Sequence, residues 1–259
     1  MTSTDSDSGT GTRPDGTIPF RATLGRSVGL FAAFRKEQTD PEFFYGKLAH
    51  DTVDQLRSYT PLDGRLVVDV GGGPGYFADA LRAEGARCLC VDSDAHEMTL
   101  HGRDADANAV QGSALDLPLR SGSVDVCFSS NVLEHVPDRI RMADEMVRVT
   151  RPGGLVYLSY TLWLSPWGGH ETSPWHYLGG SYAAERFTRK NGRRPKNDFG
   201  HSMYAAYAKE TLRWVRGRDD VDVVDIRPRY LPTWMKPIVH VPLLREIITW
   251  NLLIVLRKR

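Results

Sequence analysis

The sequence has little cysteine: Cys88, Cys90 and Cys127 are the only three among 259 residues. All three fall in apolar stretches, and their number and spacing suit neither a disulfide framework nor a zinc site. Free cysteine is among the most buried residue types, so we expect three buried, reduced thiols.

Long apolar runs and a strong net charge are absent as well. No apolar run approaches the ~18 residues of a membrane-spanning helix, and the N-terminus has no basic segment followed by an apolar one. The net charge of +1 gives no general case for binding nucleic acid. We therefore expect a cytoplasmic protein that does not act on nucleic acid.

Glycine is concentrated at one place, with four glycines between positions 71 and 75, directly after the apolar run 66–70. The stretch 73–78 fits the dinucleotide fingerprint G-x-G-x-x-[GA], in which the backbone approaches a ligand closely. Asp69 precedes the loop, and its carboxylate would repel a pyrophosphate but favour a cofactor with a cationic end. Asp92 follows about 20 residues later, where an acidic side chain receives ribose hydroxyls.

Strands and helices alternate around this loop. We expect strands at 65–70, 86–92, 107–112, 123–130, 154–160 and 221–228, and helices at 75–85, 95–102, 136–154, 208–217 and 242–250. Two further helices lie within 19–60, and residues 1–18 read as a disordered tail before one domain spanning 19–259. This pattern predicts an α/β fold with a largely parallel sheet covered on both faces.

The segment from Leu66 to Tyr160 resembles the class I S-adenosylmethionine (SAM)-dependent methyltransferases of the type 11 subfamily. Asp69 to Gly75 matches the family motif [DE]-x-G-x-G-x-G, "CVDSD" resembles its second-strand acidic motif, and "RVTRPGGLVYLSY" resembles its turn into strand five. The whole chain is also similar to a group of little-characterised actinobacterial methyltransferases. The resemblance implies SAM as cofactor, with S-adenosylhomocysteine (SAH) as its product.

The resemblance also implies a Rossmann-like seven-stranded sheet in the order 3-2-1-4-5-7-6, with strand 7 antiparallel and a cap inserted after strand 5. Residues 251–259 would be that last strand, and an amphipathic membrane anchor is the alternative interpretation. The cofactor residues predicted from the loop and the resemblance are Asp69, Gly71, Gly73, Gly75, Asp92, Ser93, Ser113, Ala114, Ser130 and Asn131, with Tyr45 closing over the methionine carboxylate. Ser113 stands where the family usually has an aspartate that contacts adenine.

The cap, residues 162–203, carries three tryptophans and the candidate acceptor site. We expect His170 or His176 to be a general base with Glu171 orienting it, and His135 of the core is the competing candidate. The glycine pairs 168–169 and 179–180 suggest hinges for closure. The histidine spacing in the cap matches no standard ligand pair, so no metal site is predicted.

The predicted reaction is methyl transfer to an oxygen of a small molecule, a sugar or a lipid-linked intermediate. An inactive SAM-binding scaffold and, less favoured, a nicotinamide-dependent oxidoreductase are the alternatives. The basic run 186–196 suggests a solvated face, an acidic substrate or a weak contact with a membrane surface. The sequence leaves the oligomeric state open.

Overall fold

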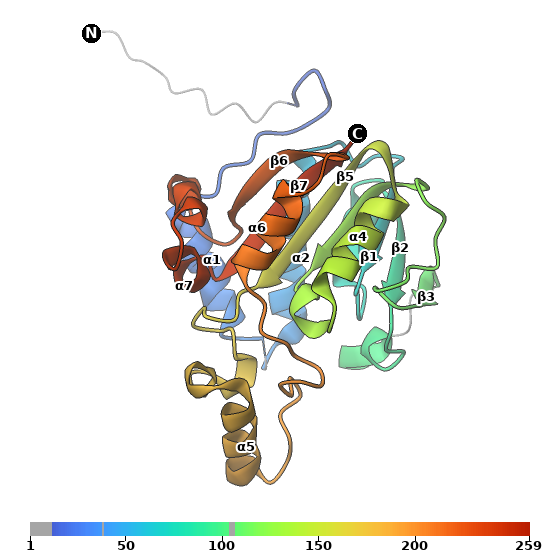
Figure 1. Ribbon diagram of the computed structural model, residues 1–259. Helices are drawn as coiled ribbons and strands as arrows, with labels where there is room; N and C mark the ends of the chain where they lie inside the picture. The colour runs from blue at the N-terminus through green and yellow to red at the C-terminus, as the bar shows by residue number, and fades with distance from the viewer. Residues whose placement is uncertain (1–11, 38, 104–106) are drawn as a thin grey trace, which may run out of the picture.

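The computed structural model describes residues 12–37, 39–103 and 107–259, which form one mixed sheet with helices on both faces (Figure 1). In these residues the sheet has seven strands in the order β3-β2-β1-β4-β5-β7-β6. β7 pairs antiparallel with both β5 and β6, and the other neighbours are parallel, as predicted. The strands are β1 (Leu66–Val70), β2 (Arg87–Asp92), β3 (Ala109–Gln111), β4 (Val124–Ser130), β5 (Thr150–Thr161), β6 (Val221–Pro228) and β7 (Asn251–Lys258).

Two hydrophobic cores, one on each face of the sheet, hold the helices in place. On one face the core includes side chains of α1 (Leu24–Phe34), α2 (Pro41–Arg57) and α3 (Tyr76–Ala83). On the other face it includes side chains of α4 (Arg139–Val149) and α6 (Ala208–Arg216), which lie in front of the sheet in Figure 1. Asp40 and Pro41 begin α2 as the sequence predicts, because the Asp40 carboxylate accepts a hydrogen bond from the Phe43 N–H at 3.2 Å.

Several element boundaries differ from the predictions. The helix expected at 95–102 is a 3₁₀ segment, η1 (Glu97–Gly102), broken at Leu100 and His101. α4 ends at Val149 and β5 begins at Thr150 rather than 154, because the chain turns directly into the strand. The helix expected at 242–250 is shortened to α7 (Leu244–Ile248) and follows the 3₁₀ segment η5 (Thr233–His240).

The final strand is confirmed, and the membrane-anchor interpretation of 251–259 is wrong. β7 lies between β5 and β6, and its residues 252–256 are fully buried against both cores. In the described part of the chain, no helix has the length and apolar character needed to cross a membrane. The three cysteines are buried, as predicted.

The cap after β5 contains η3 (His170–Thr172), η4 (Trp175–Leu178) and α5 (Gly180–Asn191). The sequence did not predict α5, which projects beyond the edge of the sheet where β5 ends (Figure 1). Gly168 and Gly169 are needed for close packing. A Cβ on Gly168 would lie 1.9 Å from the Trp163 carbonyl oxygen, and one on Gly169 would lie 2.6 Å from the His176 side chain.

The N-terminal tail was predicted to cover residues 1–18. Residues 1–11 lie outside the described residues. In residues 12–18 the chain turns back on itself, Thr17 is buried, and the Ile18 N–H donates a hydrogen bond to the Arg57 carbonyl oxygen at 3.2 Å. Residues 12–18 therefore pack against the end of α2.

Candidate active site

The glycine loop connects β1 to α3 through residues with left-handed backbone. Gly71, Gly73 and Gly75 have φ angles of 76°, 48° and 85°, which strain any residue with a Cβ. A Cβ on Gly71 would lie 2.4 Å from the Val132 side chain, whereas a Cβ on Gly73 would meet nothing closer than the Glu97 carbonyl oxygen at 4.0 Å. The backbone at Gly73 is therefore the part of the loop that a ligand can approach.

Asp69 lies in β1 beneath this loop and is completely buried. Its Oδ2 atom has no hydrogen-bond partner, although a Cβ on Gly72 would lie only 2.7 Å from it. Burial, together with the charge of Asp92, raises the pKa of Asp69 to about 7. A buried, unpaired carboxylate oxygen is costly, and a cationic group bound above the loop would offset that cost. Asp69 thus fits a cofactor with an ammonium or sulfonium end.

Asp92 ends β2 and is held beside the loop. One carboxylate oxygen accepts a hydrogen bond from the Gly73 N–H at 3.0 Å, and the other accepts one from the Asp94 N–H at 3.0 Å. A carboxylate has about four lone-pair sites, so hydroxyl donors can still bind it. The neighbouring Ser93 is exposed, and its carbonyl oxygen accepts a hydrogen bond from the Gln111 side chain at 3.2 Å.

Ser113 and Ala114 follow β3 on the same side of the loop. The Ser113 hydroxyl oxygen accepts a hydrogen bond from the Leu115 N–H at 3.1 Å, which closes a local turn. Ala114 packs against the hydrophobic core. The Ser113 hydroxyl hydrogen stays available for a ligand, so contact with adenine remains a prediction for these two residues.

Ser130 and Asn131 end β4 inside a polar network centred on Arg229. The Arg229 guanidinium donates to the hydroxyls of Ser130 at 2.7 Å and Ser159 at 2.6 Å. Asn131 has a φ of 58°, and its side-chain oxygen accepts a hydrogen bond from the Asn251 amide at 2.6 Å. The turn after β4 is therefore held by side chains from β5, from the end of β6 and from β7.

Sequence reasoning missed Arg229. Its side chain is fully buried and donates hydrogen bonds to hydroxyl oxygens, including that of Thr52 at 2.6 Å. The signal was an arginine directly after an apolar strand, in "VDVVDIRPRYL". A buried cation next to the turn at Ser130 favours an anionic group nearby, such as the carboxylate of a bound amino acid.

Tyr45 of α2 covers the start of α3. Its ring stacks on Tyr76, with centroids 5.4 Å apart and an interplanar angle of 16°. Its hydroxyl donates a hydrogen bond to the Glu37 carboxylate at 2.9 Å. Burial raises the pKa of both Tyr45 and Glu37, so the tyrosine stays neutral. Because Tyr76 directly follows the glycine loop, Tyr45 lies close to the predicted cofactor site.

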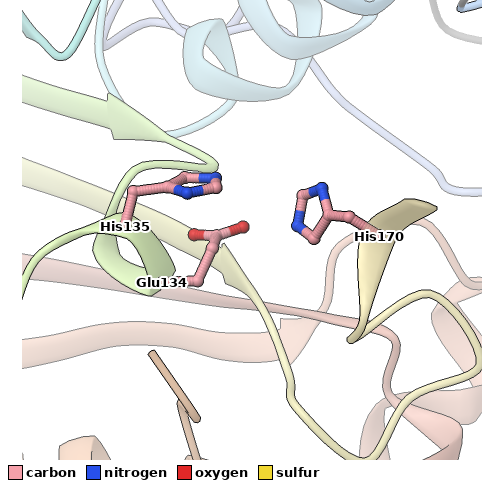
Figure 2. Close-up of side chains that lie close together, drawn as sticks. All are labelled: Glu134, His135 and His170. Atoms are coloured by element: carbon pink, nitrogen blue, oxygen red, sulfur yellow. The ribbon is translucent and has the colours of Figure 1, made fainter. Parts of the chain in front are cut away.

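Three side chains from two distant segments meet at the carboxyl edge of the sheet (Figure 2). Glu134 and His135 belong to η2 (Leu133–His135), which follows β4, and His170 begins η3 of the cap. One ligand atom of each residue lies within 4.8 Å of those of the other two. We call these three residues the His–Glu cluster.

Glu134 and His135 each form a hydrogen bond with a residue outside the His–Glu cluster. One carboxylate oxygen of Glu134 accepts a hydrogen bond from the Thr161 N–H at 3.0 Å, and the other is buried without a partner. His135 Nδ1 lies 2.8 Å from the Ser202 carbonyl oxygen. A carbonyl can only accept, so Nδ1 carries a proton, and in the neutral form of the ring Nε2 holds the free lone pair.

His170 is the member supplied by the cap. Its Nε2 atom is buried without a partner, and its backbone is left-handed with φ 47°. Burial, followed by the neighbouring His135, lowers the pKa of His170 to about 3. The imidazole is therefore neutral at physiological pH, and its unprotonated nitrogen can accept a hydrogen bond or bind a metal ion.

His176 and Glu171 are engaged elsewhere in the cap. His176 is buried, and its Nε2 lies 3.2 Å from the Ser165 carbonyl oxygen. The Glu171 carboxylate accepts hydrogen bonds from the Asn197 N–H at 2.9 Å and side chain at 2.7 Å. Both residues thus fix the path of the cap, and the structure brings neither into the His–Glu cluster.

The basic run 186–196 makes several contacts within the protein. Arg186 lies over the Trp175 ring at 3.9 Å, and Arg194 pairs with Asp198 at 2.5 Å. Lys196 forms an ion pair of 3.0 Å with Glu97 of η1. The end of the cap therefore reaches the segment after β2, beside the glycine loop.

Comparison with known proteins shows that the chain belongs to a methyltransferase family. Residues 68–158 match the methyltransferase domain family model. An uncharacterized methyltransferase of Mycobacteroides abscessus is 48% identical over 251 residues, covering 92% of this chain and 96% of the relative. A second, from Mycolicibacterium gilvum, is 50% identical over 246 residues with the same coverage.

Solved structures share the fold at lower identity. The SAM-dependent methyltransferase of Mesorhizobium loti has a TM-score of 0.55 and 20% identity, and the match covers 81% of this chain and 98% of that one. A SAM-dependent methyltransferase of Thermotoga maritima has a TM-score of 0.52 and 17% identity, over 89% of this chain and 99% of that one. These matches concern the fold.

Proposed function

We infer the reaction from one premise: the chain belongs to the SAM-dependent methyltransferase family. SAM is the methyl donor and SAH the product. We propose that the acceptor atom is an oxygen, carried by a small molecule, a sugar or a lipid-linked intermediate, and that the acceptor binds at the His–Glu cluster. The low cysteine content of the chain agrees with a reducing compartment such as the cytoplasm.

The residues around the glycine loop are proposed to hold SAM, which supplies an electrophilic methyl group on sulfur. The open backbone at Gly73 and the carboxylate of Asp92 would receive the ribose. The unpaired Asp69 carboxylate would face the positive charge of the methionine portion. Arg229 and the turn at Ser130 would position the methionine carboxylate.

The observation that supports oxygen as the acceptor is the chemistry of the His–Glu cluster. A hydroxyl must lose its proton as its oxygen forms a bond to the methyl carbon, whereas a neutral amine can attack with a free lone pair. Glu134 and His170 carry buried acceptor atoms without partners, and the Nε2 of His135 is a free lone pair. Such a set favours an acceptor that arrives with a proton to release.

The cap and α2 would supply the other requirement, which is exclusion of water. Tyr45 covers the start of α3, and Lys196 joins the end of the cap to Glu97. Holding the acceptor in line with the methyl group in a site closed on two sides favours transfer over competing reactions.

The test uses isotopically labelled SAM with lipid and polar extracts of the source organism as acceptors. NMR of the labelled product distinguishes a methyl group on oxygen from one on nitrogen or carbon. We expect an O-methyl product, formed about 100-fold more slowly by His135→Ala or His170→Ala at unchanged SAM affinity.

His50→Ala is the matched control, because His50 is exposed on α2 outside the cluster, and its rate should equal that of the unchanged protein. A product methylated on nitrogen, or full rates in both cluster variants, would contradict the proposal.

A further inference from the structure

We propose that the His–Glu cluster is a binding site for one divalent transition-metal ion of the zinc type. This inference deepens the proposed function, because it concerns the site at which the acceptor oxygen would be activated. The donor set is one carboxylate and two imidazoles, which suits zinc and its neighbours better than magnesium or calcium, whose preferred ligands are oxygens.

The geometry of the three side chains supports this assignment. Their ligand atoms lie within 4.8 Å of one another, although His135 and His170 come from separate elements (Figure 2). Atoms bound to one zinc ion at about 2.0–2.2 Å lie roughly 3–4 Å apart, so side-chain rotations alone would close the site.

Unsatisfied atoms point to a missing ligand. The free oxygen of Glu134 and the Nε2 of His170 are both buried, and neither has a hydrogen-bond partner. Buried polar atoms nearly always have partners, and two orphans side by side are unusual. A cation between them would satisfy both at once and would also engage the Nε2 of His135, whereas a proton shared by Glu134 and His170 would leave that third ligand atom unused.

The outer contacts of the cluster match those of metal-binding histidines. Such histidines commonly donate their other ring N–H to a carbonyl or carboxylate, which fixes the tautomer and the ring orientation. His135 does this through Nδ1 and the Ser202 carbonyl oxygen, at 2.8 Å. Glu134 is anchored in the same way by the Thr161 N–H.

Three protein ligands would leave a coordination position for the acceptor. A hydroxyl bound there has a lowered pKa and releases its proton to water. The oxygen then forms a bond to the methyl carbon, the carbon–sulfur bond breaks, and SAM becomes SAH. No other reactant is needed.

The test is metal binding by the untagged, chelator-stripped protein in the absence of any acceptor. Cobalt(II) titration followed by visible absorption, and zinc content by mass spectrometry, should both give one ion per chain. His170→Ala and His135→Ala should each weaken binding at least about tenfold. His201→Ala, an exposed histidine of the same cap, is the control and should bind normally.

Substoichiometric metal, or binding that both cluster variants retain, would overturn the proposal. SAM binding by each variant checks that the fold survives, and His170→Ala leaves the contact between Glu134 and Thr161 intact. The two proposals can fail separately. An N-methylated product from a protein with one bound ion would refute oxygen as the acceptor atom. An O-methylated product from a protein that binds no metal would refute the metal site.

A different observation concerns another surface of the molecule, where α1, η5 and α7 form one exposed apolar face. Large apolar side chains there are 46–76% exposed: Leu24, Val28, Trp234, Leu243, Leu244 and Ile247. The elements adjoin one another. The Thr233 N–H of η5 donates a hydrogen bond to the Ala22 carbonyl oxygen, just before α1, at 2.8 Å. The ring centroids of Phe31 in α1 and Trp250, just after α7, lie 5.7 Å apart. Figure 1 shows α1 and α7 side by side.

The charge of this face has one sign. Residues 16–36 and 226–248, which build it, contain one acidic residue, Glu246 of α7, and its side chain is buried. Arg21, Arg35 and Lys36 are exposed within them, whereas Lys236 of η5 is half-buried and paired with Asp225 at 2.6 Å. Apolar side chains with an interfacial tryptophan and surrounding cations are typical of surfaces that rest on anionic lipid bilayers.

We infer from this second observation that the face formed by α1, η5 and α7 binds an anionic membrane surface. A groove of about 1160 Å³ lies beside it, lined by Leu243, Pro242, Trp214, Tyr207 and Leu164 and by charged residues such as Glu210 and Arg213. Its largely apolar lining suits an acyl chain. The inference therefore favours a lipid-anchored acceptor within the proposed function.

The test is co-sedimentation of the full chain with phosphatidylglycerol and with phosphatidylcholine vesicles. We expect binding to the anionic vesicles only, weaker at high salt. The double variant Trp234→Asp/Leu243→Asp should bind the anionic vesicles at least about tenfold more weakly. Val223→Asp, at a 51% exposed apolar residue on β6, is the control and should bind normally.

Three outcomes would overturn the membrane inference: no binding to anionic vesicles, equal binding to both lipids, or retention in the double variant. Light scattering adds a further check, because a dimer that the double variant abolishes would show that a second copy covers this face. Unchanged SAM binding confirms that each variant is folded.

Discussion

The N–H of Gly73 donates a hydrogen bond of 3.0 Å to the carboxylate of Asp92. This bond ties the glycine loop after β1 to the end of β2. It holds an open stretch of backbone next to an acidic side chain, which is the arrangement that a ribose requires.

We expect Asp92→Ala to weaken SAM binding by about 1–3 kcal/mol, because charged hydrogen-bond partners of the ribose are lost. Gly73→Val should abolish binding, since its side chain would fill the approach to the loop and strain a backbone at φ 48°. Isothermal titration with SAM measures both. Gly64→Ala, at a left-handed glycine with nothing within 4 Å of its Cβ, is the control for strain alone.

The buried Asp69 predicts opposite effects of pH on binding and on stability. Its folded pKa is about 7, above the ordinary value of 3.8, so the folded state holds a proton that the unfolded state releases between these values. Stability should fall, on the order of a few kcal/mol, as pH rises from about 4 to 7. SAM affinity should rise through pH 7, because the ionised carboxylate attracts the cation.

Urea unfolding and SAM titration from pH 5 to 8 check both trends, and Asp69→Asn should flatten both. Asp92 and Arg82 are the charged groups that influence Asp69, so the Asp92→Ala protein is measured in parallel. A pH-independent SAM affinity in the unchanged protein would show that Asp69 does not face the cofactor charge.

Arg229→Ala should destabilise the protein by about 2–5 kcal/mol, because it leaves the buried hydroxyls of Ser130, Ser159 and Thr52 without their donor. Urea unfolding measures the effect. Arg216→Ala removes an exposed arginine of α6 and should change stability by less than about 0.5 kcal/mol. If the two substitutions changed stability equally, the hydrogen bonds of Arg229 would not be what stabilises this site.

Gly169→Ala should displace the cap locally, because its Cβ would lie 2.6 Å from the His176 side chain. We expect faster hydrogen exchange in 162–178 and slower methyl transfer, with SAM affinity nearly unchanged. Gly192→Ala is the comparison in the same cap, directly after α5, because nothing lies within 4 Å of its Cβ and it adds only the local strain of a left-handed φ of 68°. Unchanged exchange in the first variant would show that the cap can absorb the extra methyl group.

Local sequence pattern was sufficient for the glycine loop and for the alternation of strands and helices, whereas the order of the sheet was implied by the family resemblance. The loop, the acidic ends of β1 and β2, and the alternation of apolar runs are each contained in a few neighbouring residues. α5 was missed because it buries only Gly180, Ala183 and Ala184, and such small residues form no apolar stripe.

The His–Glu cluster could not be predicted for a different reason. His170 was a candidate within the cap and His135 a candidate within the core, and the sequence offered them as alternatives. Their rings lie 5.3 Å apart because the chain after β5 returns over the end of β4. Likewise, Arg229 reaches Ser130 across 99 positions of sequence. Such pairings arise from tertiary packing, which a local pattern does not contain.

The place of β7 in the sheet has a consequence for how the chain folds. β7 pairs with β5 on one side and with β6 on the other, and Leu158 meets Ile254 across almost a hundred residues of sequence. Until β7 inserts, β5 and β6 each present an unpaired, apolar edge. We expect this late, long-range pairing to limit the rate of folding and to make the interval before it the stage at which the protein is most prone to aggregate.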